Sequence, residues 1–125
     1  MDAYLDALCK ELTYIGETMK VRTLDTIYIG GGTPTTLEPE QLERLLSHIE
    51  CCFPTREVKE YTIEAGRPDS ITREKLEVIR KYPVTRISVN PQTMNQATLD
   101  LIGRRHTVED TRHAFALAGN VDLII

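Results

Sequence analysis

The sequence has no tryptophan, only two phenylalanines and no long hydrophobic run among its 125 residues. No apolar stretch approaches the roughly 18 residues that a helix needs to cross a bilayer. The chain opens on an acidic amphipathic segment, MDAYLDALCKEL, which lacks the charged-then-apolar order of a signal peptide. We therefore expect a cytoplasmic protein without a membrane span.

Cysteine is also scarce, and the three cysteines do not follow a metal-binding or disulfide pattern. Cys9, Cys51 and Cys52 are an odd set without CxxC spacing. Such a set favours buried or incidental thiols over metal ligands or a disulfide framework. Neighbouring side chains diverge at a helix end, so Cys51 and Cys52 are poorly placed to bind one ion together. The sequence predicts no metal site from its own cysteines.

Basic runs are missing as well, because 15 lysines and arginines are scattered among 19 acidic residues and the net charge is −4. Proteins that bind nucleic acid neutralise rows of phosphates with clustered basic side chains, so we expect no nucleic-acid partner. With 41% hydrophobic and 27% charged residues, the composition is typical of one ordinary soluble domain. We expect residues 1–125 to form a single domain with a modest core.

Hydrophobic periodicity predicts helices that alternate with short strands. Leu5, Leu8, Leu12, Ile15 and Met19 recur at helical spacing, which places them on one stripe of an opening helix. Short runs of β-branched and aromatic residues predict strands between the later helices. The predicted strands are 24–29, 61–64, 86–89 and 121–125, and the later predicted helices begin near Pro39, Thr72, Asn95 and Thr107.

Strands that are separated by helices run parallel, through right-handed crossovers, with the helices covering the sheet. The predicted fold class is therefore α/β, with a parallel sheet of about four strands. A complete eight-unit barrel needs about 250 residues. The chain is accordingly either a small open sheet or part of a (β/α) barrel.

Polar residues gather where the predicted strands end. The first strand is followed by Gly31, Gly32 and Thr33, the second ends at Glu64, and the third is followed by Gln92. In a parallel sheet these loops share one edge, where ligands bind. Two further candidates for this edge are Arg104 (or its neighbour Arg105), which follows a short helix, and Asp122, which lies in the fourth strand.

Taken one at a time, these residues leave alternatives open. A glycine triplet lets the backbone approach a ligand closely and adopt positive φ, but it also serves as a flexible turn. Glu64 stands at the end of an apolar strand, where an unpaired carboxylate is unfavourable. Its partner is either a ligand amine or a structural cation such as Arg67 or Arg86.

The combination of motifs is more specific than its parts. In order along the chain stand TIYIGGGTPTTL, TIEAGRPDSIT, VTRISVNPQTMN, LDLIGRRHT and VDLII. The set resembles the radical S-adenosylmethionine (SAM) domain of oxygen-independent coproporphyrinogen III oxidases and their relatives. It is closest to the Gram-positive coproporphyrinogen dehydrogenase subgroup, and the resemblance covers essentially the whole chain.

The resemblance implies a partial (β/α) barrel that binds SAM. In the family, a [4Fe–4S] cluster on a CxxxCxxC-type loop reduces SAM, and the resulting radical starts the decarboxylation of coproporphyrinogen propionates to vinyl groups. A tetrapyrrole substrate and a reductant protein such as flavodoxin or ferredoxin are also implied.

Site roles are carried over from the resemblance by position. The amino end of the SAM methionine would be contacted by Gly31, Gly32, Thr33 and Glu64. Its carboxylate would be paired with Arg104, and the sulfonium and ribose would be contacted by Gln92 and Asp122.

The chain also departs from the family pattern. The cysteine loop that would precede the opening helix is absent from residues 1–125, the stretch between Arg104 and Asp122 is short, and the family's continuation after the last strand is missing. We expect an incomplete radical SAM core domain that is inactive alone, with cluster ligands outside this chain. Two alternatives stay open: a haem-binding chaperone of the same family, and an α/β module without an active site.

Overall fold

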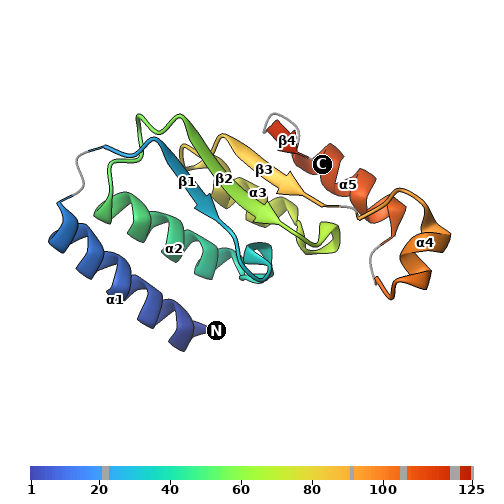
Figure 1. Ribbon diagram of the computed structural model, residues 1–125, viewed down its shortest axis with the longest axis horizontal. Coiled ribbons are helices and arrows are strands. Elements are labelled where there is room, and N and C mark those ends of the chain that lie inside the picture. Colours follow the sequence, from blue (N-terminus) through green and yellow to red (C-terminus); the bar gives the residue numbers. More distant parts are fainter. Residues whose placement is uncertain (21–22, 91, 105–106, 119–121, 125) are drawn as a thin grey trace.

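The computed structural model describes residues 1–20, 23–90, 92–104, 107–118 and 122–124. Helices and strands alternate as the sequence predicts (Figure 1). The helices are α1 (Asp2–Met19), α2 (Pro39–Cys52), α3 (Arg73–Arg80), α4 (Gln96–Leu101) and α5 (Val108–Ala118), with two short 3-10 helices, η1 (Pro34–Thr36) and η2 (Pro68–Ser70). The strands are β1 (Thr26–Ile29), β2 (Glu60–Ala65), β3 (Arg86–Val89) and β4 (Asp122–Ile124).

The four strands form one sheet in the order β1-β2-β3-β4, and every neighbouring pair is parallel. The predicted α/β fold with a parallel sheet is therefore confirmed, and it is consistent with part of a (β/α) barrel. Since all strands run the same way, the loops that follow β1, β2 and β3 emerge at one edge of the sheet. Figure 1 shows η1, η2 and α4 at this carboxyl edge.

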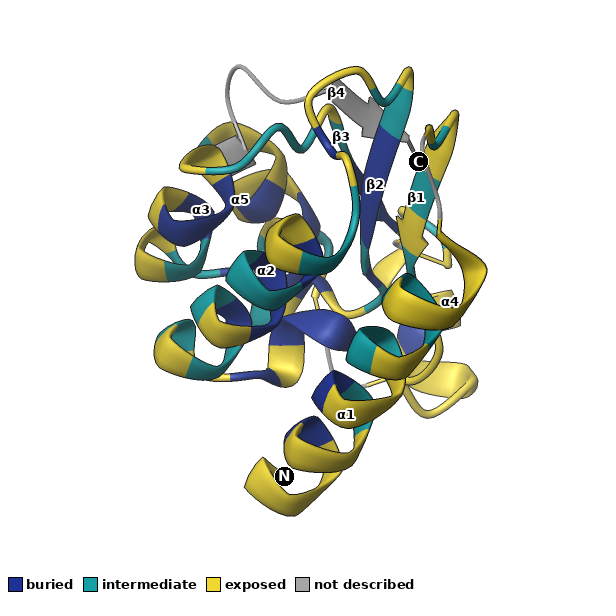
Figure 2. Ribbon diagram, turned by 90° about the vertical axis from the view of Figure 1, so that its left-hand side faces the viewer, coloured by how far each residue is buried: buried dark blue, intermediate teal, exposed yellow. Residues whose placement is uncertain are grey.

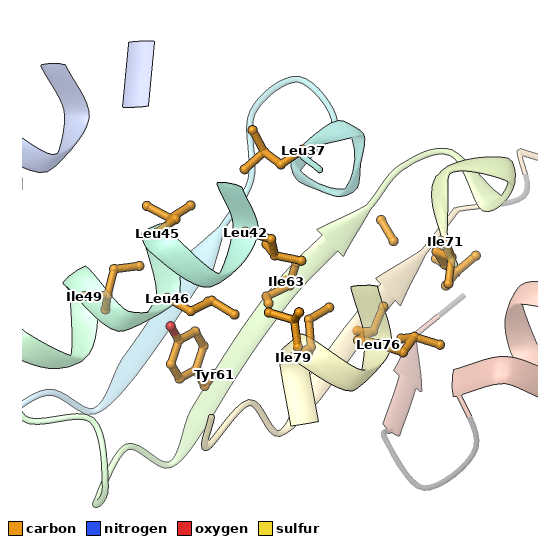
Figure 3. Packing of buried hydrophobic residues seen from close by; sticks show 14 of the residues in the cluster. Leu37, Leu42, Leu45, Leu46, Ile49, Tyr61, Ile63, Ile71, Leu76 and Ile79 are labelled. Atoms are coloured by element: carbon orange, nitrogen blue, oxygen red, sulfur yellow. The ribbon is translucent and has the colours of Figure 1, made fainter. Parts of the chain in front are cut away.

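The core lies between one face of the sheet and the helices. On β2, Tyr61, Ile63 and Ala65 are buried in this core, because alternate residues of a strand point to the same face. Leu42 and Leu46 of α2 pack there and are fully buried (Figure 3). The cluster also contains residues of α1, α3 and α5, so these helices lie on the same side of the sheet as α2 (Figure 2).

Among the described residues, Tyr61 is the largest fully buried side chain, and its hydroxyl has no hydrogen-bond partner there. Burial raises the pKa of Tyr61 far above the ordinary value of 10.0, and the negative charge of Glu50 adds to the effect. This tyrosine therefore stays neutral and acts as a core residue.

Local capping signals fix where several helices begin. Pro39 is the first residue of α2, as predicted, because a missing N–H is harmless at that position. The Thr72 hydroxyl accepts from the backbone N–H of Lys75 at 3.3 Å and caps α3. At α5, Thr107 and Asp110 make a reciprocal capping box, with N to Oδ2 and N to Oγ1 distances of 2.8 and 3.0 Å.

Helices α1 and α2 approach closely at Gly16. A β-carbon there would lie 3.0 Å from the carbonyl oxygen of Cys52. One turn earlier, His48 Nε2 lies 2.8 Å from both the Cys9 carbonyl and the Thr13 hydroxyl. A carbonyl only accepts, so Nε2 carries the hydrogen, and the imidazole joins the two helices.

Among the described residues, no helix is both long and apolar enough to cross a membrane.

Candidate functional site

The loop after β1 exposes its backbone at the carboxyl edge of the sheet. Gly31 and Gly32 are both exposed, and Gly31 has a φ of +98°. A β-carbon on either residue would meet no atom within 4 Å. The positive φ explains why residue 31 is glycine. Gly32 has no such φ, and the open space around it leaves its backbone free to contact a ligand.

Glu64 lies beside this loop, on the sheet face opposite the helices. A β-carbon at Gly30 would lie 3.0 Å from Glu64 Oε2 and 2.4 Å from Tyr28 Cε1, so any larger residue at position 30 would displace the Tyr28 side chain. Farther along the same two loops, a β-carbon at Gly66 would lie 3.8 Å from the hydroxyl oxygen of Thr33. The structure therefore brings the glycine loop and Glu64 together, as the sequence predicts.

The environment of Glu64 was only partly anticipated. Within the part of the chain that the structure describes, no cation forms an ion pair with Glu64: Arg86 pairs with Glu60 at 3.3 Å instead, and Arg67 forms no ion pair. Its neighbour is Tyr28, a residue that is 60% exposed. The pKa of Tyr28 is raised above 10.0 by desolvation, and then by the charge and hydrogen bonding of Glu64. The alternative in which Arg67 or Arg86 pairs with Glu64 is therefore wrong. The sequence analysis did not identify Tyr28 and Gly30 as neighbours of Glu64.

A second polar group lies on the same sheet face, nearer the amino edge. The Thr62 hydroxyl donates to Glu60 Oε1 at 3.2 Å, and Arg86 pairs with the same carboxylate. This group satisfies itself internally, whereas Glu64 keeps a carboxylate with no cationic partner among the described residues.

Side chains also tie the loop after β1 to the loop after β2. Lys75 Nζ donates to the carbonyl oxygens of Thr35 and Ser70, at 2.6 and 3.1 Å. The hydroxyl oxygens of Thr35 and Ser70 lie 2.5 Å apart, and the Ser70 hydroxyl donates to the Arg67 carbonyl at 2.6 Å. The two loops therefore form one hydrogen-bonded unit.

The remaining predicted site residues are less closely grouped. Gln92 follows β3 and is exposed, with a φ of +66° that is unusual for a residue with a β-carbon. Its backbone N–H donates to Asn90 Oδ1 at 2.9 Å. Arg104 is exposed and follows α4, which lies beyond the carboxyl edge on the side of β3 and β4 (Figure 1). Arg105 lies outside the described residues.

Asp122 opens β4 and is paired in register with Arg86, the first residue of β3. Glu64 is paired with Ser88, two residues farther along β3. At about 3.3 Å per residue, the backbone of Asp122 is about 7 Å nearer the amino edge than the level of Glu64. Its side chain lies outside the described part of the structure.

The described cysteines do not fit an iron–sulfur cluster. Cys9 is buried in α1, and Cys51 and Cys52 end α2 at the edge of the sheet opposite the glycine loop (Figure 1). Across the described residues, no three histidine, cysteine or acidic side chains group so as to hold a metal ion. The glycine loop and Glu64, in contrast, fit SAM. An open glycine backbone and a carboxylate that has no cationic partner among the described residues suit the ammonium group of its methionine moiety.

A comparison with protein families decides the relationship. The family model for the radical SAM superfamily matches residues 8–124. The chain belongs to the radical SAM superfamily. Proteins of this superfamily bind SAM and a [4Fe–4S] cluster, so the glycine loop is at the edge where a radical SAM domain is expected to bind its cofactor.

Three curated relatives narrow the relationship. The chain is 44% identical to the oxygen-independent coproporphyrinogen-III oxidase-like protein HemZ of Bacillus subtilis (98% of this chain, 26% of HemZ), and 41% identical to the heme chaperone HemW of Lactococcus lactis (86% and 27%). It is 27% identical to the oxygen-independent coproporphyrinogen III oxidase of Cereibacter sphaeroides (90% and 25%). The family resemblance drawn from the motifs is confirmed.

The chain spans about a quarter of the length of these relatives. The alignment with HemZ extends over 133 residues and so exceeds the 125 residues of this chain. HemZ therefore carries residues within the aligned region that have no counterpart here.

Proposed function

We propose that this chain is the SAM-binding part of a radical SAM oxidoreductase that decarboxylates coproporphyrinogen III propionates to vinyl groups. The observation that carries the proposal is the pairing of the exposed glycine loop with Glu64, which has no ion-pair partner among the described residues. An ammonium group is the ligand chemistry that both features favour, and SAM presents an ammonium group at its methionine end.

The roles follow the chemistry of each group. Carbonyls of Gly31 and Gly32 and the side chain of Thr33 accept hydrogen bonds from the ammonium group, and Glu64 neutralises its charge. Arg104 pairs with the methionine carboxylate, since a guanidinium forms two parallel hydrogen bonds to a carboxylate. Gln92 and Asp122 contact the sulfonium and ribose side. The positive φ of Gln92 supports this role, because strained backbone is common where residues contact a ligand.

Bound SAM and a reduced [4Fe–4S] cluster would supply the radical chemistry, with cluster ligands that are not among the described residues. This chain's own residues would bind SAM at the carboxyl edge and orient its methionine end. A protein of the flavodoxin or ferredoxin type would deliver the electron.

The likeness to HemW supports a second candidate function, a haem-binding chaperone. The SAM-binding motifs are compatible with both functions, so the substrate assay must separate them.

The test uses the full-length gene product that contains this chain, reconstituted anaerobically with iron and sulfide. The proposal expects SAM cleavage to 5′-deoxyadenosine and methionine, and conversion of coproporphyrinogen III with loss of carbon dioxide. Haem binding and transfer to an apo-acceptor without decarboxylation would select the chaperone. Absence of both SAM binding and SAM cleavage would overturn the proposed site. The variant Glu64→Gln removes the charge that is proposed to neutralise the ammonium group of SAM. Glu60→Gln, which removes a carboxylate charge elsewhere on the same strand, is its control.

A further inference from the structure

The ammonium group of Lys75 lies between two loops that belong to different strands. Its nitrogen donates to the Thr35 carbonyl, two residues after Thr33, and to the Ser70 carbonyl in η2. Lys75 is half-buried, and among the described residues no carboxylate forms an ion pair with it. Hydrogen bonds to charged groups are stronger than neutral ones, so this contact is a substantial link between the loops.

The donor and acceptor of the hydrogen bond between the Thr35 and Ser70 hydroxyls can be assigned. Ser70 has one hydroxyl hydrogen and donates it to the Arg67 carbonyl. In the contact between the two hydroxyls, Thr35 is therefore the donor and Ser70 the acceptor. Thr35 is 2% exposed, so its hydroxyl is shielded from water, whereas the Ser70–Arg67 hydrogen bond is exposed. The loop after β1 is thus held to the loop after β2 by both a charge and a hydroxyl.

The location of Lys75 is unfavourable for the helix alone. It is the third residue of α3, and its backbone N–H is bound by the capping hydroxyl of Thr72. A cation in the first turn is opposed by the helix dipole. The favourable interactions of Lys75 are therefore its hydrogen bonds to the two loops, and not an interaction with the dipole of its own helix.

We propose that Lys75 is a positioning residue for the SAM site. The inference rests on the proposed function and adds a residue that contacts no ligand. By holding the carbonyl of Thr35, Lys75 fixes the path of the chain that leaves Gly31 and Gly32. By holding Ser70, it fixes the segment that follows Glu64. The separation of the two groups that accept the methionine ammonium is then set before SAM arrives, which lowers the ordering cost of binding.

The test is calorimetric titration of the full-length, cluster-reconstituted protein with SAM, which reports the dissociation constant and the number of binding sites separately. Lys75→Met keeps an unbranched, flexible side chain that is one atom shorter, and removes the charge. We expect a dissociation constant about tenfold weaker, which corresponds to about 1.4 kcal/mol, with the number of sites unchanged. The control is Lys81→Met, directly after the last residue of α3, where the lysine pairs with Glu43 at 3.2 Å and with no other carboxylate of the described residues. It should bind SAM as the wild type does.

The two measured quantities separate positioning from simple destabilisation. A variant that is merely less folded would show fewer sites with the dissociation constant of the wild type, and that result overturns the inference. An unchanged dissociation constant with all sites present overturns it as well. If Lys75→Met does not fold, Thr35→Val removes the hydroxyl link instead, and its expected weakening is about threefold, with a value within experimental error of the wild type as the refuting result. If the wild type itself does not bind SAM, the proposed function has failed.

Discussion

Gly31 and Gly32 are adjacent and exposed, but the structure assigns them different reasons for being glycine. The φ of +98° at Gly31 disfavours any residue with a β-carbon, so Gly31→Ala should destabilise the fold by about 1–2 kcal/mol. No such φ occurs at Gly32, and a β-carbon there would meet nothing within 4 Å. Gly32→Ala should therefore leave the free energy of unfolding unchanged or raise it by up to about 1 kcal/mol, since alanine restricts the unfolded chain.

Ligand binding should rank the two variants differently. If SAM contacts the backbone of Gly32, an added methyl group fills the space that the ligand needs. We expect Gly32→Ala to weaken SAM binding at least about tenfold, or 1.4 kcal/mol, without loss of stability. Gly31→Ala should lose both stability and affinity.

The assay combines urea unfolding, read by circular dichroism, with calorimetric titration of the same full-length samples with SAM. Stability and affinity are measured independently, so the two effects are not confused. Wild-type affinity in Gly32→Ala would refute the reasoning, because the open space at this residue would then have no connection with the ligand. A large loss of stability in Gly32→Ala would show that the local geometry is different from the one described.

Three further predictions concern other parts of the molecule. Gly16→Leu should destabilise the protein by about 1–3 kcal/mol in urea unfolding, because the side chain must push α1 away from Cys52, and Gly16→Ala should be the milder variant. Glu64→Gln should lower the pKa of Tyr28 toward 10.0 in a spectroscopic titration of the phenol. In the wild type, the stability that Tyr28 contributes is complete below pH 10. This stability is lost as the pH rises through the higher pKa of Tyr28 in the folded protein. Thr72→Ala should cost about 1 kcal/mol through loss of the α3 cap, and Thr72→Ser should restore most of it.

Local sequence signals were sufficient for the elements and their order. Helical spacing of leucines, β-branched runs and helix-breaking prolines depend on residues close together in the chain, so they predict α2, β2 and α3 without knowledge of the fold. Strands alternating with helices then imply a parallel sheet, and a parallel sheet places the glycine loop, Glu64 and Gln92 at one edge. The family motifs were equally readable, because they are contiguous words in the sequence.

Tertiary structure decided which side chains meet. The partner of Glu64 depends on register and side-chain reach: Arg86 is on the neighbouring strand but pairs with Glu60, and Tyr28 of β1 lies beside Glu64 instead. The link from Lys75 to Thr35 joins residues that are 40 positions apart, and no periodicity or spacing predicts it. Sequence determined the elements and the shared edge, because these follow from local propensity and chain connectivity. Contacts across that edge follow from packing of segments distant in the chain, and only the folded arrangement fixes them.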